Sequence, residues 1–196
     1  MKKKKPIAEF KLSAYALDQL PLNGFPHIAF AGRSNVGKSS LLNSLLDQKG
    51  LAKTSSTPGR TQAINVFEID SSYYFIDLPG YGFAKAPISV KEKWAKLVDS
   101  YFQKCRELAG VILLLDCRRT PNEDDLILLD WLISRQAPFI IALTKSDKLG
   151  RGKLSQTMRT LERELPGGII PYSSPKGTGK KELWSWIRVA LEEYES

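Results

Sequence analysis

The chain has 196 residues, of which 42% are hydrophobic and 26% are charged. This composition is ordinary for a globular protein, the length suits one domain with a substantial core, and no apolar run approaches the roughly 20 residues that span a bilayer. The net charge of +8 favours a polyanionic partner such as nucleic acid, a ribonucleoprotein or an anionic membrane surface, although a generally basic surface would give the same balance.

Rare residues exclude several kinds of site. Cys105 and Cys117 stand in no metal-binding spacing, so we expect two buried or half-buried thiols. Because His27 is the single histidine, neither a zinc site nor a Ser-His-Asp triad is expected. The lysines at 2–5 have the charge of a signal peptide, but Pro6 and charged residues after it break the apolar stretch that should follow, so we expect a cytoplasmic protein.

Residues 1–26 are punctuated by three prolines and an Asn-Gly pair. We expect an N-terminal extension that packs on the domain, with a short helix within 13–20. Residues 27–196 are expected to form a single domain.

Strand and helix patterns alternate along residues 27–196. Apolar runs predict strands at 27–31, 111–115, 138–143 and 168–171, and β-forming residues on either side of a turn predict a hairpin over 64–69 and 73–76. Apolar residues at helical spacing predict helices from Lys38 and over 90–108, 122–134, 153–165 and 180–194. We therefore expect a three-layer α/β/α fold with a mostly parallel six-stranded sheet and one antiparallel strand. Ligands bind at the carboxyl ends of the strands in such a sheet.

The first motif lies between the strand at 27–31 and the helix from Lys38, and matches G-x-x-x-x-G-K-[ST]. It consists of Gly32, Arg33, Ser34, Asn35, Val36, Gly37, Lys38 and Ser39. Its glycines let backbone N–H groups surround a phosphate, Lys38 supplies a positive charge, and the Ser39 hydroxyl is a natural Mg²⁺ ligand. The alternative is a glycine-rich turn with an incidental lysine, but the order of strand, loop and helix favours a P-loop NTPase.

A second motif directly follows the strand at 73–76 and comprises Asp77, Leu78, Pro79 and Gly80. An aspartate at a strand end can hold Mg²⁺ through a water molecule, and the N–H of Gly80 can meet the γ-phosphate. An ordinary Asp-x-Pro-Gly turn would have the same sequence.

Guanine recognition is predicted by Thr144, Lys145, Ser146 and Asp147, which follow the strand at 138–143. The carboxylate of Asp147 can accept both donors on one edge of guanine, whereas adenine would leave this charge unpaired. The stem of Lys145 can lie over the base. A polar turn that caps the next helix is the alternative, and Thr144 replaces the asparagine that more often begins this pattern. Backbone groups of Tyr172, Ser173 and Ser174, after the last strand, could bind the guanine carbonyl. Together, motifs in this order indicate a GTPase of the Ras-like G-domain type.

One threonine is also needed to close on Mg²⁺ and the γ-phosphate, and we choose Thr61, with Thr54 and Thr57 as competitors. The metal ligands are then Ser39, Thr61 and Asp77. The loop around this threonine, which should also contact the nucleotide, contains Gly59, Arg60, Thr61, Gln62 and Ala63. The second switch should extend from Asp77 to about Ser89.

The residue after Gly80 is Tyr81, where many GTPases have a glutamine that orients the attacking water. We therefore expect slow unaided turnover that needs a partner protein or a K⁺ ion, with Asn35 as a candidate K⁺ ligand. Equal rates in K⁺ and Na⁺ would contradict this role for Asn35. The groups expected to take part in catalysis are Lys38, Thr61, Gly80 and Asn35.

These segments resemble the EngB (YihA/YsxC) family of bacterial GTPases over about residues 28–180. The resemblance implies GTP/GDP binding with Mg²⁺, a role in assembly of the large ribosomal subunit, and a link to cell division and septation. The family often has lysine where this chain has Thr57. The segments that carry the resemblance are 32–40, 54–62, Asn65 with Phe67, 77–84, 144–147 and 173–174.

Basic residues that follow the guanine motifs are candidates for contact with rRNA of the large subunit, although glutamates interrupt them and a solvated mixed-charge face would look similar. They are Lys145, Lys148, Arg151, Lys153, Arg159, Arg163, Lys176, Lys180, Lys181 and Arg188. We expect a monomer. Two other functions remain open: a small-molecule kinase, for which no acceptor site or arginine lid is evident, and a nucleotide-gated binding module with little catalysis.

Overall fold

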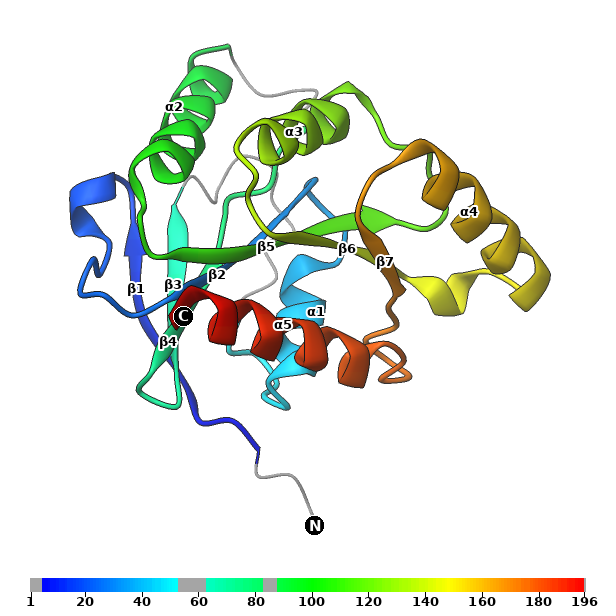
Figure 1. The fold of residues 1–196 in the computed structure, drawn as a ribbon, viewed down its shortest axis with the longest axis horizontal. Helices are drawn as coiled ribbons and strands as arrows, with labels where there is room; N and C mark the ends of the chain where they lie inside the picture. The colour runs from blue at the N-terminus through cyan, green and yellow to red at the C-terminus, as the bar shows by residue number, and fades with distance from the viewer. Residues whose placement is uncertain (1–4, 53–62, 83–87, 196) are drawn as a thin grey trace.

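The computed structural model describes residues 5–52, 63–82 and 88–195. Seven strands form one sheet in the order β1-β3-β4-β2-β5-β6-β7 (Figure 1). Their bounds are β1 Ala8–Ala14, β2 His27–Gly32, β3 Ile64–Ile69, β4 Tyr73–Asp77, β5 Leu108–Asp116, β6 Phe139–Thr144 and β7 Gly168–Pro171. β3 is antiparallel to both of its neighbours, and the other pairings are parallel, as predicted.

The predicted number of six strands is wrong, because residues 8–14 form a seventh. This strand, β1, pairs with β3 and places Phe10 opposite Phe67, with ring centroids 5.8 Å apart. Charged side chains at Glu9 and Lys11 interrupt the apolar pattern, as is common on an edge strand that faces solvent. Part of the expected N-terminal extension is therefore an edge of the sheet, and the helix expected within 13–20 is reduced to the 3₁₀ turn Leu17–Gln19.

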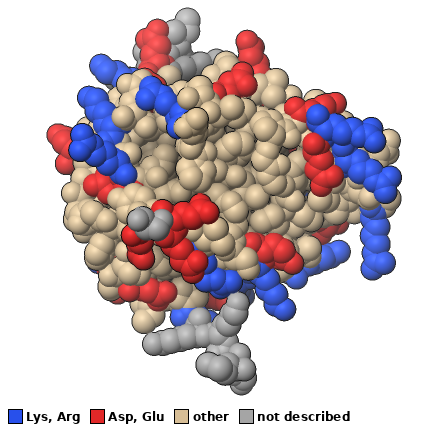
Figure 2. All heavy atoms as spheres, in the orientation of Figure 1, with Lys and Arg blue, Asp and Glu red and all other residues tan. Residues whose placement is uncertain are grey.

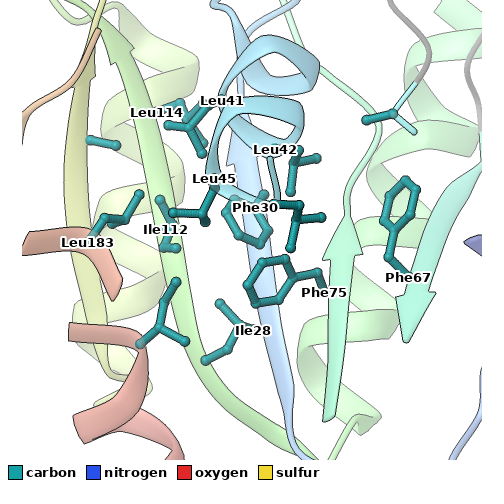
Figure 3. Close-up of a cluster of buried hydrophobic side chains, with 14 of the residues drawn as sticks. Ile28, Phe30, Leu41, Leu42, Leu45, Phe67, Phe75, Ile112, Leu114 and Leu183 are labelled. Atoms are coloured by element: carbon teal, nitrogen blue, oxygen red, sulfur yellow. The ribbon is translucent and has the colours of Figure 1, made fainter. Parts of the chain in front are cut away.

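Helices cover both faces of the sheet, which confirms the three layers. α1 (Lys38–Leu45) and α5 (Lys180–Glu195) pack on one face, where Leu41, Leu45 and Leu183 join a buried cluster around Phe30 (Figure 3). α2 (Ile88–Lys104), α3 (Glu123–Ser134) and α4 (Arg151–Glu164) cover the other. Within the described ranges, no helix is long and apolar enough to cross a membrane.

Element boundaries follow local chemistry. The side chain of Asn122 caps α3 by accepting from Asp125 N at 3.2 Å, as its position predicts. α2 ends four residues before the predicted Leu108, which instead begins β5.

Both cysteines are buried and free, as expected. Burial lowers the pKa of His27, the neighbour of Cys105, to about 4, so this imidazole is neutral at pH 7.

Candidate functional site

The phosphate loop joins the central strand β2 to α1. Gly37 precedes α1 with φ of 106°, a conformation that glycine adopts readily. Gly32 lies so close to β5 that an added Cβ would stand 2.9 Å from the carbonyl oxygen of Leu114. Asn35 also has a positive φ, of 63°. The backbone of this loop therefore requires glycine at positions 32 and 37 and favours asparagine or glycine at position 35.

Lys38 and Asp77 meet at the phosphate end of the site. The Lys38 ammonium donates to Oδ1 of Asp77, and Asn65 Nδ2 donates to the other carboxylate oxygen at 3.1 Å. Asp77 is the last residue of β4 and only 5% exposed, so it needs these partners. With the hydroxyl of Ser39 beside Lys38 at the start of α1, the donors fit a hard cation such as Mg²⁺. Asn65 was not predicted as a site residue, although a polar residue in the apolar pattern of β3 is a signal of one.

Gly80 and Tyr81 lie against the phosphate loop. An added Cβ at Gly80 would stand 3.1 Å from the backbone nitrogen of Ser34, and this nitrogen donates to Tyr81 O at 2.8 Å. The Tyr81 side chain is 4% exposed, and its hydroxyl donates to Oδ1 of Asp125 in α3 at 2.7 Å. Burial and this carboxylate raise the pKa of Tyr81, so the phenol stays protonated. The Tyr81 hydroxyl is therefore held by its hydrogen bond to α3.

The guanine motif is bound to the phosphate loop by two side chains. The Thr144 hydroxyl lies 2.7 Å from Val36 O and 3.0 Å from Leu115 O, and it links the loop with β5. The hydroxyl of Thr144 thus contacts two carbonyl oxygens at the position where this motif more often has the amide of an asparagine. Lys145 Nζ donates to Asn35 O at 2.7 Å, and the stem of Lys145 passes Gly37.

Asp147 is held by the segment that follows β7. Ser173 Oγ donates to Oδ1 of Asp147 at 2.8 Å, and this hydrogen bond lowers the pKa of Asp147, so the carboxylate is charged at neutral pH. Ser146 N donates to Tyr172 O at 3.1 Å, which aligns the two loops. The structure thus brings the two predicted guanine-binding segments together, with Ser174 directly after Ser173, as their positions after neighbouring strands predict.

A carboxylate that was not predicted, Asp116, ends β5 beside this motif. It accepts from Lys145 Nζ at 2.9 Å and from Arg118 Nη2 at 2.7 Å. Burial raises the pKa of Asp116, but hydrogen bonds from Arg118 and Lys145 outweigh burial, so the pKa lies well below its usual range. The sequence signal that could have identified Asp116 as a site residue is an aspartate at the end of an apolar strand, with Arg118 two residues later.

Other predicted site residues are distributed as follows. Leu78 and Pro79 are buried, and the Leu78 nitrogen donates to Phe30 O at 3.1 Å. Ala63 is buried immediately before β3. Gly59, Arg60, Thr61 and Gln62, the competitors Thr54 and Thr57, and part of the expected second switch lie outside the described residues.

One end of the site holds the Lys38 ammonium and the oxygen atoms of Asp77 and Ser39, and the other end holds the ionised carboxylate of Asp147. The phosphate loop connects the two ends. This polarity suits a nucleoside triphosphate whose phosphates lie over Gly32–Ser39 and whose base lies between Lys145 and Asp147.

Comparisons with known proteins agree with this geometry. The family described as 50S ribosome-binding GTPase matches residues 27–145. The "Probable GTP-binding protein EngB" of Halothermothrix orenii is 42% identical over 200 residues, which span 100% of both chains. The protein of the same name from Chlorobaculum tepidum is 49% identical over 92% of this chain and 95% of its own. A crystal structure of a "probable GTP-binding protein engB" matches with a TM-score of 0.71 and 26% identity, covering 85% of this chain and 99% of that one. The chain therefore belongs to the EngB family of GTP-binding proteins, which are G-domain GTPases.

Proposed function

We propose that this GTPase works as a Mg²⁺-dependent molecular switch that assists assembly of the large ribosomal subunit. The observation that supports the switch most directly is the contact of Lys38 with Asp77, because it joins the phosphate loop to the strand that leads into Gly80. Ser39, Thr61 and Asp77 would hold the metal, which supplies positive charge at the β- and γ-phosphates. The N–H of Gly80 would donate a hydrogen bond to the γ-phosphate only when GTP is bound. Backbone groups of the segment 59–63 would close over this phosphate.

Slow hydrolysis is part of this proposal, because Tyr81 replaces the usual water-orienting glutamine and its hydroxyl is bound to Asp125. Positive charge beside the transferred phosphoryl group would then come from a ribosomal partner or from K⁺, with Asn35 as a ligand. The exposed carboxamide of Asn35 stands on the phosphate loop at a φ of 63° that glycine also tolerates.

Replacing Asn35 by glycine tests the K⁺ proposal without straining the loop. In single-turnover assays, the wild type should hydrolyse GTP several-fold faster in K⁺ than in Na⁺, and Asn35→Gly should abolish the difference. Since the glycine keeps the carbonyl that accepts from Lys145, GTP affinity should change little. Equal wild-type rates in the two salts would contradict a K⁺ site at Asn35.

The ribosomal role draws on the resemblance to the EngB family and on exposed basic residues at the guanine end. Figure 2 shows Lys and Arg gathered over α4, with acidic residues between them. Three of the ten predicted residues form ion pairs: Lys145 with Asp116, Lys180 with Asp47 at 2.5 Å, and Lys148 with Asp147 at 3.5 Å. The α4 surface, defined here as Lys153, Arg159 and Arg163, is exposed and is our candidate for rRNA contact. We propose a cytoplasmic monomer whose loss would impair septation.

Co-sedimentation with ribosomal subunits tests this role. The GTP-bound form should sediment with the large subunit, the GDP-bound form should not, and affinity should fall as salt rises. Alanine at Lys153, Arg159 and Arg163 together should weaken binding and make its salt dependence shallower by about 2 units in the logarithmic slope. A control triple of Lys49, Lys96 and Arg135 to alanine removes the same charge from other exposed positions. Equal effects of the two triples, or binding that ignores salt, would argue against phosphate contact by α4.

A further inference from the structure

The side chain of Asp116 lies behind the predicted base-stacking lysine. Asp116 is the last residue of β5, and its register partner in β6 is Thr144, the residue before Lys145. Its carboxylate is 7% exposed, so its charge is largely removed from water and must be paired. Oδ2 accepts from Lys145 Nζ, and Oδ1 accepts from Arg118 Nε at 2.9 Å and from Arg118 N at 3.1 Å.

Lys145 is held at three points by the end of β5 and the phosphate loop. Its ammonium donates to Asp116 at 2.9 Å and to Asn35 O at 2.7 Å, and its own carbonyl accepts from Cys117 Sγ at 3.1 Å. Its backbone has φ of 59°, which a lysine adopts only where surrounding contacts impose it. The long stem is consequently extended beside Gly37, whereas a free lysine would sample many rotamers.

We propose that Asp116 is a positioning residue for nucleotide binding: it fixes the Lys145 ammonium so that the lysine stem forms a preordered platform for the guanine base. The inference extends the proposed GTP site and rests on it. Asp116 does not read the base, since Asp147 supplies the acceptors for that. It lowers the ordering cost of the stem before the nucleotide arrives, and such preorganisation appears mainly in the dissociation rate.

The rival explanation is a purely structural ion pair that supports the β5 end. A double-mutant cycle separates the two, because a residue that acts through the Lys145 ammonium has no effect once that ammonium is gone. Lys145→Met keeps an unbranched apolar stem and removes the ammonium. Asp116→Asn keeps the shape of the carboxyl group and removes its charge, and Asp116→Glu keeps the charge.

Release of a fluorescent GDP analogue from the full chain is the measurement. Asp116→Asn should accelerate release about 10-fold, the usual effect of losing a hydrogen bond to a charged group. Asp116→Glu should recover part of this loss, and Asp116→Asn on the Lys145→Met background should add less than about two-fold. Arg118→Ala, which leaves the Asp116–Lys145 pair intact, is the matched control and should stay within about two-fold of wild type.

A second readout identifies the route of the effect. IDP lacks the 2-amino group from which Asp147 is expected to accept a hydrogen bond, so the ratio of GDP to IDP affinity measures recognition of the base. Asp116→Asn should weaken both nucleotides equally and leave this ratio unchanged, because the lysine stem stacks on either base. Additive effects of Asp116→Asn and Lys145→Met, a wild-type release rate in Asp116→Asn, or a changed GDP/IDP ratio would each overturn the inference. Failure of the wild type to prefer GDP over ADP would instead overturn the proposed function.

Discussion

Replacing Asp147 by asparagine should lower the affinity for GTP by at least about 100-fold and remove the preference for GTP over ATP. The carboxylate offers two acceptor atoms to the N1–H and 2-amino groups of guanine, whereas the asparagine amide places a donor against one of these donors. The same change should raise affinity for XTP, whose 2-carbonyl accepts a hydrogen bond. Competition of each unlabelled nucleotide against a fluorescent GDP analogue measures all three effects.

Ser173→Ala is the matched control. It removes the hydrogen bond that Ser173 Oγ donates to Oδ1 of Asp147 at 2.8 Å, but it leaves the carboxylate in place. It should weaken GTP binding by only about 10-fold and keep the order of GTP over ATP and XTP. Undiminished GTP selectivity in Asp147→Asn would contradict this assignment and favour a site that binds phosphate alone, as in the kinase alternative.

The motif positions were predictable because chemistry and topology coincide at one edge of the sheet. Four strands end at this edge: β2 at Gly32, β4 at Asp77, β5 at Asp116 and β6 at Thr144. All of these ends except that of β5 were located by apolar runs followed by polar motifs. Parallel strands bring such ends together, so sequence order alone implied a common site.

Pairings between distant side chains were not predictable. Nothing in the spacing of Asp116 and Lys145, 29 positions apart, distinguishes an anchored lysine from a free one. Likewise, the sequence shows that Tyr81 replaces a glutamine, but only the fold shows its hydroxyl on Asp125. β1 was missed for another reason, because solvent exposure of an edge strand removes the apolar signal that identifies interior strands.

The Lys38–Asp77 contact leads to the second large prediction. Lys38→Met should reduce single-turnover GTP hydrolysis by about 10²–10³-fold, because it removes a fixed positive charge from the site where the transferred phosphoryl group develops negative charge. It should also destabilise the nucleotide-free protein by about 1–3 kcal/mol, since Asp77, 5% exposed, would keep only Asn65 as a side-chain partner among the residues that the structure describes.

The two effects of this substitution can be separated with Asp77→Asn in the same chain. An asparagine at 77 carries no charge and can still accept from Asn65, so the double variant should regain most of the lost unfolding free energy in chemical denaturation. Hydrolysis should stay at the level of Lys38→Met or below it, because neither the lysine charge nor the proposed Mg²⁺ ligand returns. Recovery of hydrolysis together with stability would mean that Lys38 acts only by supporting the fold. Persistent loss of hydrolysis in the stable double variant would assign the Lys38–Asp77 pair to phosphate and metal chemistry.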